Sequence, residues 1–178
     1  MRNAKAGNKT VQQFRDAALP WLDDAYALAQ ILMRTEVDAE QAVQDCYLRA
    51  LRQFDGVRGP AVRCWLLAIL RAVCRKRRGE MPGRRATPTN STDYNATTEH
   101  CDAPTIRQLI GELPAPLGEV IALRDVIDLS YKEIAEVTGV PVTTVMSRIA
   151  DARGLLLAAR RAANKAPPAG RTKPTVLG

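Results

Sequence analysis

The sequence predicts an all-α protein with two small helical domains joined by a flexible linker, the second domain containing a helix-turn-helix. Apolar residues recur at helical spacing in both halves of the chain. The stretch between the halves is rich in Pro, Gly, Ser, Thr and Asn and almost free of apolar residues, as flexible linkers are. We therefore expect domains at residues 11–78 and 105–163, a linker at residues 79–104 and a disordered basic tail at residues 164–178.

The first domain begins, in this prediction, after a frayed polar tail formed by the first ten residues. Apolar residues between Val11 and Leu32 keep helical spacing, and Pro20 marks a kink or a break between two helices. Asp38 can cap the next helix, with Gln41 three residues on in the capping-box position. That helix is expected to run from Ala39 to Phe54.

Charge is distributed unevenly along the chain. There are 26 Lys and Arg against 19 Asp and Glu, and the formal net charge of +7 favours a polyanionic partner. Residues 15–55 nevertheless carry eight acids and four bases, whereas residues 71–85 carry seven bases and one acid. One surface therefore suits a basic protein, and another suits nucleic acid.

The excess of bases falls at the end of a predicted helix that runs from Ala61 to about Arg78. Bases at a helix C-terminus interact favourably with the helix dipole, so a merely solvated basic face is the alternative interpretation. Five bases in eight residues exceed what a cap needs, and we expect them to contact phosphates. These bases are Arg71, Arg75, Lys76, Arg77 and Arg78.

The stretch from Leu129 to Arg153 predicts the helix-turn-helix. Ser130 and Glu133 have the spacing of a capping box, and Gly139 falls where the turn needs a positive φ. Pro141 is acceptable early in the second helix, where its missing amide hydrogen has no partner to lose. An αα-hairpin that packs in a bundle and touches no DNA is the alternative. The residues expected to face inward from the second helix are Val142, Val145, Ile149 and Ala152.

The residue types favour a protein that is not an enzyme and has no cofactor or metal. The four cysteines form no C-x-x-C pair and are expected to be small buried thiols in a reducing cytoplasm. His100 and Cys101 are adjacent, but two neighbouring ligands without a second pair are weak evidence of a metal site. No apolar run is long enough to span a bilayer, and the N-terminus lacks the apolar core of a signal peptide. We expect a cytoplasmic protein without membrane insertion.

Three motifs follow each other along the chain: DAEQAVQDCYLRAL (Asp38–Leu51), RCWLLAILRAVCRKRR (Arg63–Arg78) and LPAPLGEVIALRDVIDLSYKEIAEVTGVPVTTVMSR (Leu113–Arg148). In this order they resemble bacterial sigma factors of the extracytoplasmic-function (ECF) group, which keep two conserved domains joined by a linker. The first is similar to the family's helix that docks on the clamp helices of the RNA polymerase β′ subunit. The second resembles the promoter-melting helix, and the third resembles the domain that reads the minus-thirty-five element.

The resemblance implies an alternative sigma factor that binds core RNA polymerase at the β′ clamp helices and the β flap, and directs promoter recognition and transcription initiation. It also implies that the loop around Asp55 and Gly56 lies near an unstacked base of the minus-ten element. The residues assigned to core polymerase are Asp38, Glu40, Gln44, Asp45 and Arg49. The residues assigned to promoter DNA are Arg58, Arg71, Arg75, Lys76 and Arg77 near the opened strand and Thr143, Thr144, Ser147 and Arg148 in the upstream reader.

The chain departs from the family pattern in both DNA-binding stretches. Ala72 and Lys76 stand where family members commonly have Asn and Asp, and Met146 stands where a base is usual. Upstream contacts are therefore expected to be fewer or aimed at different bases.

Two domains on a tether can close on each other or around a partner. We therefore expect an anti-sigma protein that covers the acidic helix and the upstream reader. The rival interpretation is a stand-alone helix-turn-helix transcriptional regulator. The acidic helix and the basic cluster argue against it, because a repressor needs neither.

Overall fold

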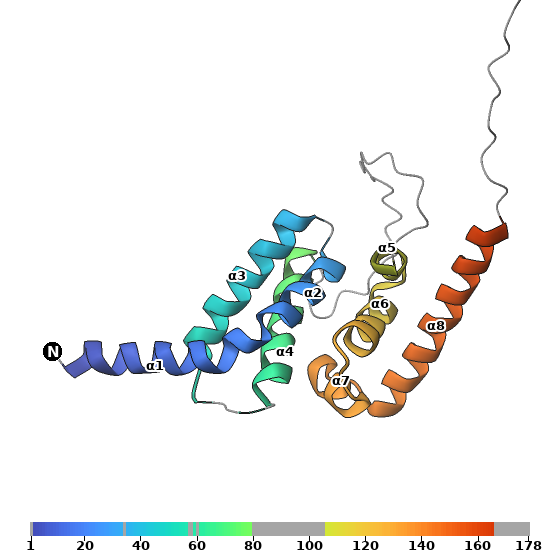
Figure 1. Cartoon of the computed structure of the whole chain (residues 1–178). Helices are drawn as coiled ribbons and strands as arrows, with labels where there is room; N and C mark the ends of the chain where they lie inside the picture. The colour runs from blue at the N-terminus through green and yellow to red at the C-terminus, as the bar shows by residue number, and fades with distance from the viewer. Residues whose placement is uncertain (1, 34, 57–58, 60, 80–105, 166–178) are drawn as a thin grey trace, which may run out of the picture.

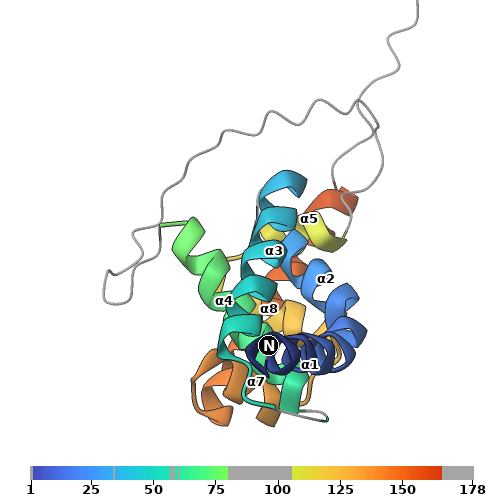
Figure 2. The same ribbon diagram turned by 90° about the vertical axis from the view of Figure 1, so that its left-hand side faces the viewer.

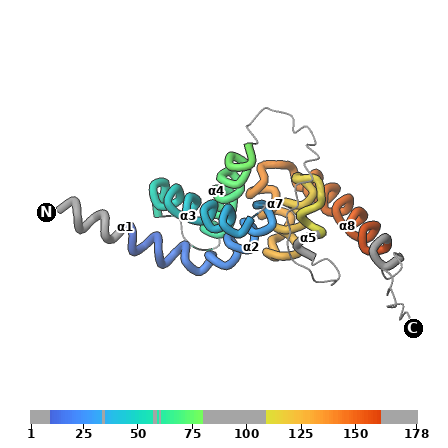
Figure 3. The backbone as a smooth tube through the Cα atoms, turned by 90° about the horizontal axis from the view of Figure 1, so that it is seen from above, coloured from blue at the N-terminus to red at the C-terminus, as the bar shows by residue number. Residues whose placement is uncertain are grey.

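The computed structural model describes the backbone of residues 2–33, 35–56, 59, 61–79 and 106–165, and the side chains from residue 10 to 161 within those ranges except 106–108. Every regular element in these ranges is a helix, which confirms the predicted all-α class. Helices α1 to α4 form a first unit and α5 to α8 a second unit beside it (Figures 1 and 3). The predicted linker and tail lie almost wholly outside the described residues.

Pro20 interrupts the first helical stretch, as predicted. Helix α1 (Arg2–Ala18) ends before it, the 3-10 segment η1 (Leu19–Trp21) contains it, and α2 (Leu22–Leu32) follows. The prediction of a frayed tail is wrong for residues 2–10, because α1 begins at Arg2 and projects from the rest of the first unit (Figure 1). Once a helical turn exists, each further residue adds one hydrogen bond, so the helix extends through this polar stretch.

Helix α3 (Glu36–Gln53) is capped by Thr35, not by Asp38 as predicted. Thr35 Oγ1 accepts a hydrogen bond from the Asp38 amide at 3.1 Å and donates one to Asp38 Oδ2 at 2.7 Å. Both residue types cap helices well, and with Thr35 as the cap, Asp38 occupies the third helical position, where its carboxylate accepts from the Thr35 hydroxyl. The acidic first turn also favours this start, since carboxylates there interact well with the helix dipole.

Helix α4 (Ala61–Arg77) confirms the predicted basic helix, and the second unit contains four α-helices among the described residues. They are α5 (Ile106–Gly111), α6 (Ala115–Ile121), α7 (Tyr131–Thr138) and α8 (Val142–Lys165). The sequence pattern did not indicate that α6 continues directly into a π-helical segment, η2 (Ala122–Val126). Two residues after this segment, Asp128 has a φ of +58°, and the chain turns there toward α7.

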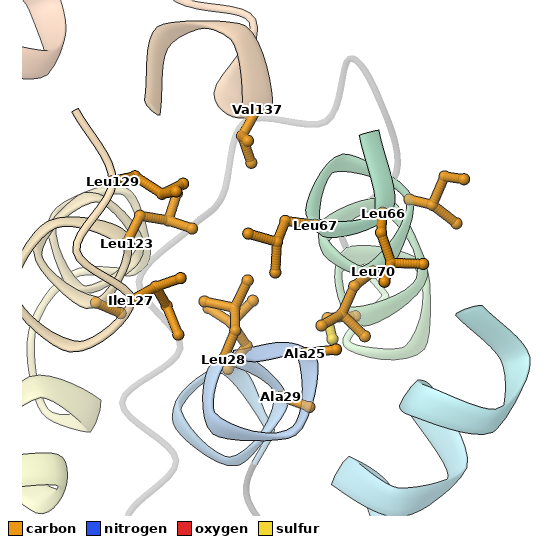
Figure 4. Packing of buried hydrophobic residues seen from close by; sticks show 14 of the residues in the cluster. Ala25, Leu28, Ala29, Leu66, Leu67, Leu70, Leu123, Ile127, Leu129 and Val137 are labelled. Carbon is orange, nitrogen blue, oxygen red and sulfur yellow. The ribbon is translucent and has the colours of Figure 1, made fainter. Parts of the chain in front are cut away.

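The two units share one apolar core, whereas two domains connected only by a flexible linker would each have a core of their own. In Figure 4, Leu67 points from α4 toward the second unit, and Leu28 of α2 lies beside it. The second unit contributes side chains from η2, from the turn after it and from α7. The core side chains of Figure 4 that lie where the two units meet are at most 4% exposed: Leu28, Leu67, Leu123, Ile127, Leu129 and Val137.

The Ser130→Ala variant is expected to lower the free energy of unfolding by about 1 kcal/mol at pH 7, because it removes the capping hydroxyl of α7. Hydrogen bonds from the Ser130 hydroxyl and amide lower the pKa of Glu133 below its ordinary value. A lowered folded-state pKa stabilises the protein above the unfolded-state value, and this contribution is lost as the pH falls through the folded-state value. Urea unfolding should therefore show a smaller difference between variant and parent at acid pH. A difference that grows on acidification would contradict this account.

Candidate functional site

The helix-turn-helix has the geometry that the sequence predicts. Ser130 Oγ accepts from the Glu133 amide at 3.3 Å, and Glu133 Oε2 accepts from the Ser130 amide at 2.8 Å, which completes the capping box. Gly139 has a φ of +70°, and its amide donates to the Ala135 carbonyl at 2.8 Å. Pro141 stands immediately before α8 instead of inside it. Gly139 adopts the left-handed conformation that the turn requires, and Pro141 precedes the first residue of α8.

The first turns of α8 present one side to the core and the other to solvent. Val145, Ile149 and Ala152 are buried, as predicted, whereas Val142 is only half-buried. The four predicted upstream readers lie on the outer side: Thr143 and Ser147 are exposed, and Thr144 and Arg148 are half-buried. Met146, which replaces the expected base, is 51% exposed on the same side. At the start of the second helix, polar side chains can hydrogen-bond to base edges in the major groove, and apolar side chains can contact thymine methyl groups.

Helix α3 carries the residues predicted to bind polymerase. Glu40, Gln44, Asp45 and Arg49 are exposed, whereas Asp38 is half-buried and engaged with Thr35. Leu48 lies among them with 55% exposure, and the sequence analysis missed it. Its position in the sequence could have indicated this exposure, because Leu48 follows Gln44 by four residues and Asp45 by three and therefore shares their helix face. We call the exposed side chains Glu40, Gln44, Asp45, Leu48 and Arg49 the α3 face.

The structure divides the predicted basic cluster at the end of α4. Arg77 turns back to α3: its Nη2 lies 2.6 Å from Asp45 Oδ2, and its Nη1 donates to Gln41 Oε1 at 3.1 Å. Arg77 is therefore placed at the α3 face, next to the residues predicted to bind polymerase. This long-range ion pair was not predicted.

Arg71 turns the other way, toward the second unit. Its Nε is hydrogen-bonded and ion-paired to Glu119 Oε1 of α6, and the two side chains are 17% and 7% exposed. The remaining bases of the cluster are Arg75 and Arg78, which are half-buried, and Lys76, which is exposed. The C-terminal end of α4 stands out beside α3 in Figure 2. Of the predicted minus-ten loop, Asp55 and Gly56 are exposed, and Arg58 lies outside the described residues.

Three cysteines are buried free thiols, as predicted, and His100 and Cys101 lie outside the described residues. Burial raises the pKa of Cys46 to about 12 and that of Cys74 to about 11. Burial, followed by the charges of Glu133 and Glu136, also raises the pKa of Cys64. Among the described residues, no group of three or more acidic, His or Cys side chains is arranged to hold a metal ion. No helix in the described ranges is long and apolar enough to cross a membrane.

Comparison with known families divides the chain at the same place. Residues 19–79 match the model of Sigma-70 region 2, and residues 105–156 match the model of Sigma-70, region 4. The first match covers α2 to α4, and the second covers α5 to α7 and the beginning of α8. The α3 face and the basic cluster therefore lie in the region 2 match, and the helix-turn-helix lies in the region 4 match.

Curated proteins and solved structures agree with these family matches. The ECF RNA polymerase sigma factor SigC of Mycobacterium tuberculosis (strain CDC 1551 / Oshkosh) is 32% identical over 128 residues, which are 67% of this chain and 69% of SigC. The ECF RNA polymerase sigma factor EcfG of Rhodopseudomonas palustris (strain TIE-1) is 31% identical over 150 residues, which are 81% of this chain and 83% of EcfG.

Two solved structures have a similar fold. CnrH, in complex with the cytosolic domain of CnrY, superposes with a TM-score of 0.63 and 26% identity over 89% of this chain and 94% of CnrH. The sigma factor RpoE of Bartonella quintana, in complex with the anti-sigma factor NepR, gives a TM-score of 0.60 and 24% identity over 80% of this chain and 93% of RpoE. With both conserved regions present and relatives of this similarity, the chain belongs to the ECF RNA polymerase sigma factors.

Proposed function

We propose that this chain is an alternative sigma factor that binds core RNA polymerase in the cytoplasm, directs it to promoters and contributes no catalysis of its own. The observation that carries the proposal is the presence, on one chain, of an exposed α3 face in region 2 and an exposed helix-turn-helix reader in region 4. A promoter-specificity subunit needs both, because it must hold the enzyme and the DNA at the same time.

The α3 face is the proposed contact with the β′ clamp helices. Its charged side chains Glu40, Asp45 and Arg49 are exposed, so an approaching partner can pair with them without unfolding the helix. Leu48 adds an apolar contact in the middle of the face, where partial burial against a protein is favourable. Arg77 steadies Asp45 from α4 and so helps to fix the shape of this surface.

Promoter contacts are proposed at two places. The C-terminal end of α4, with Arg75 and Lys76, would hold phosphates of the opened minus-ten strand, and the loop after α3 would receive an unstacked base. The outer side of α8 would enter the major groove of the minus-thirty-five element, with Arg148 as the strongest base-reading candidate. Region 4 is also the proposed contact with the β flap.

An anti-sigma protein is the proposed regulator. Support comes from the two structural neighbours, each of which was solved with a bound protein. We expect such a protein to cover the α3 face and the upstream reader and thereby compete with polymerase. A chain that purifies alone from its host and is constitutively active there would contradict this part of the proposal.

A stand-alone regulator has less support, since nothing in such a protein requires a region 2 match. Pull-down with purified core polymerase separates the two functions. A sigma factor is retained by core enzyme without DNA. A stand-alone regulator is retained by duplex DNA but not by core enzyme.

A further inference from the structure

The outer side of α8 carries an apolar row beside a polar one. Val142, Met146 and Ala150 follow each other at four-residue spacing and therefore lie in a line along the first turns of the helix. Thr143 and Ser147 form the neighbouring polar row by the same spacing. Met146 and Ala150 are exposed, and Val142 is half-buried. We call Val142, Met146 and Ala150 the apolar row of α8.

Met146 is the largest member of the apolar row, and its side chain is not needed to hold the helix in place. Val145 and Ile149, on the inner side of α8, are at most 2% exposed and pack in the core. Met146 is 51% exposed, so a large part of its flexible thioether side chain faces water. Covering that surface with an apolar group is favourable. The chemistry of this position therefore favours an apolar partner.

The two residues that follow Met146 offer different chemistry to a partner. Ser147 Oγ donates to the Thr144 carbonyl at 3.1 Å, so its hydrogen is used within the helix and its oxygen remains as an acceptor. Arg148 can only donate. Consecutive helical residues point about 100° apart, so the start of α8 presents an apolar group, an acceptor and a donor in turn across its outer side.

The major groove of DNA contains a matching apolar group. Each base pair presents its own pattern there, and thymine is distinguished by its C5-methyl group. The adenine paired with it adds an N6 amino donor, which suits the acceptor oxygen of Ser147. A lysine or arginine in place of Met146 would instead suit the O6 and N7 acceptors of guanine. The apolar row therefore fits an A·T pair better than a G·C pair.

We propose that Met146 is a specificity-determining residue of the upstream reader: its side chain contacts the C5-methyl group of a thymine in the minus-thirty-five element, and the chain prefers an A·T pair there. The inference rests on the proposed function, because it takes the start of α8 as the major-groove reader. The region 4 match includes the whole apolar row, and Figure 1 shows α7 and the first turn of α8 together at the lower end of the second unit.

Replacing thymidine by deoxyuridine tests this contact, because deoxyuridine lacks only the methyl group and keeps the base pair. The template is a promoter that core polymerase transcribes with the full parent chain. Each thymine of its minus-thirty-five element is replaced singly, and the holoenzyme concentration that gives half-maximal run-off transcript is measured. We expect this concentration to rise about fourfold at one thymine, the effect of losing burial of one methyl-sized group.

Three variants of the chain assign the effect to a side chain. Met146→Ala should require about fourfold more holoenzyme on the thymidine promoter and should lose the further effect of deoxyuridine at that position. Met146→Leu keeps an apolar side chain of similar volume and should keep most of the deoxyuridine effect. Leu157→Ala is the matched control, because Leu157 is 52% exposed farther along the same helix, beyond the region 4 match. It should show the full effect.

Equal transcription from every deoxyuridine promoter would overturn the inference and leave the proposed function intact. A deoxyuridine effect that persists in full in Met146→Ala would assign the methyl contact to another side chain, and would also overturn it. The same holds for a minus-thirty-five element that contains no A·T pair. A parent chain that gives no promoter-specific transcript would instead refute the proposed function, and the inference with it.

Discussion

Replacing both Glu40 and Gln44 by lysine is expected to weaken binding of the chain to core RNA polymerase on the order of 10- to 100-fold. Both side chains are exposed on the α3 face, so the change should reverse the local charge without disturbing the helix. Asp45 is a less clean target, because its carboxylate also pairs with Arg77, and reversing it would place two positive charges together. Fluorescence anisotropy with labelled chain and purified core enzyme measures the effect.

The matched control for this variant is Glu112→Lys, which adds positive charge to an exposed site on the second unit. It should bind core enzyme like the parent. Circular dichroism should give the parent's helical signal for both variants. If the Glu40/Gln44 variant binds core normally, the α3 face is not the polymerase contact, and another surface of region 2 must be sought.

The Arg148→Ala variant is expected to reduce promoter-dependent transcription with little effect on core binding. A bidentate contact of arginine with a guanine edge contributes about 1–3 kcal/mol, which corresponds to roughly 5- to 150-fold. Arg148 is half-buried on the outer side of α8, which fits a side chain whose stem packs on the helix and whose head reaches outward. Run-off transcription over a range of chain concentrations measures the loss.

Arg160→Ala is the matched control, because it removes the same charge from an exposed position near the far end of the same helix. It should cost far less transcription than Arg148→Ala. Equal losses would mean that α8 contributes only non-specific attraction to phosphates. Loss of core binding by Arg148→Ala would show that this surface contacts the enzyme.

Local sequence signals predicted the helix-turn-helix well. The capping box of Ser130 and Glu133 and the left-handed turn at Gly139 depend on residues within four positions of one another, so their pattern is visible in the sequence. The cap of α3 was harder to predict, because two candidate capping residues lie only three positions apart and the local pattern does not choose between them. Thr35 and Asp38 are both good capping residues, and only the structure shows that Thr35 caps the helix and donates its hydroxyl hydrogen to the Asp38 carboxylate.

Contacts between distant residues could not be predicted in the same way. Arg71 and Glu119 are 48 positions apart, and Arg77 and Asp45 are 32 apart, so no spacing rule relates them. The sequence therefore shows the basic cluster, but it does not show that Arg77 contacts α3 and Arg71 contacts the second unit while the other bases remain at the end of α4. The π-helical segment also escaped prediction, because its apolar pattern is compatible with continuation of α6.

The apolar stripe on α4 is wider than contact with a single helix requires. Leu66 and Leu67 are both fully buried, although neighbouring residues of a helix point in directions about 100° apart. A helix that is apolar over so wide an arc packs against two partners. That pattern predicts a second contact for α4 beyond α3, which is the contact the second unit provides.

Run-off transcription with purified core polymerase on fragments of the host's genomic DNA tests the central claim most directly. The account predicts that adding the chain produces discrete transcripts from a small set of fragments that core enzyme alone does not transcribe. If core enzyme starts at the same positions with and without the chain, the chain does not act as a sigma factor, even if it binds duplex DNA.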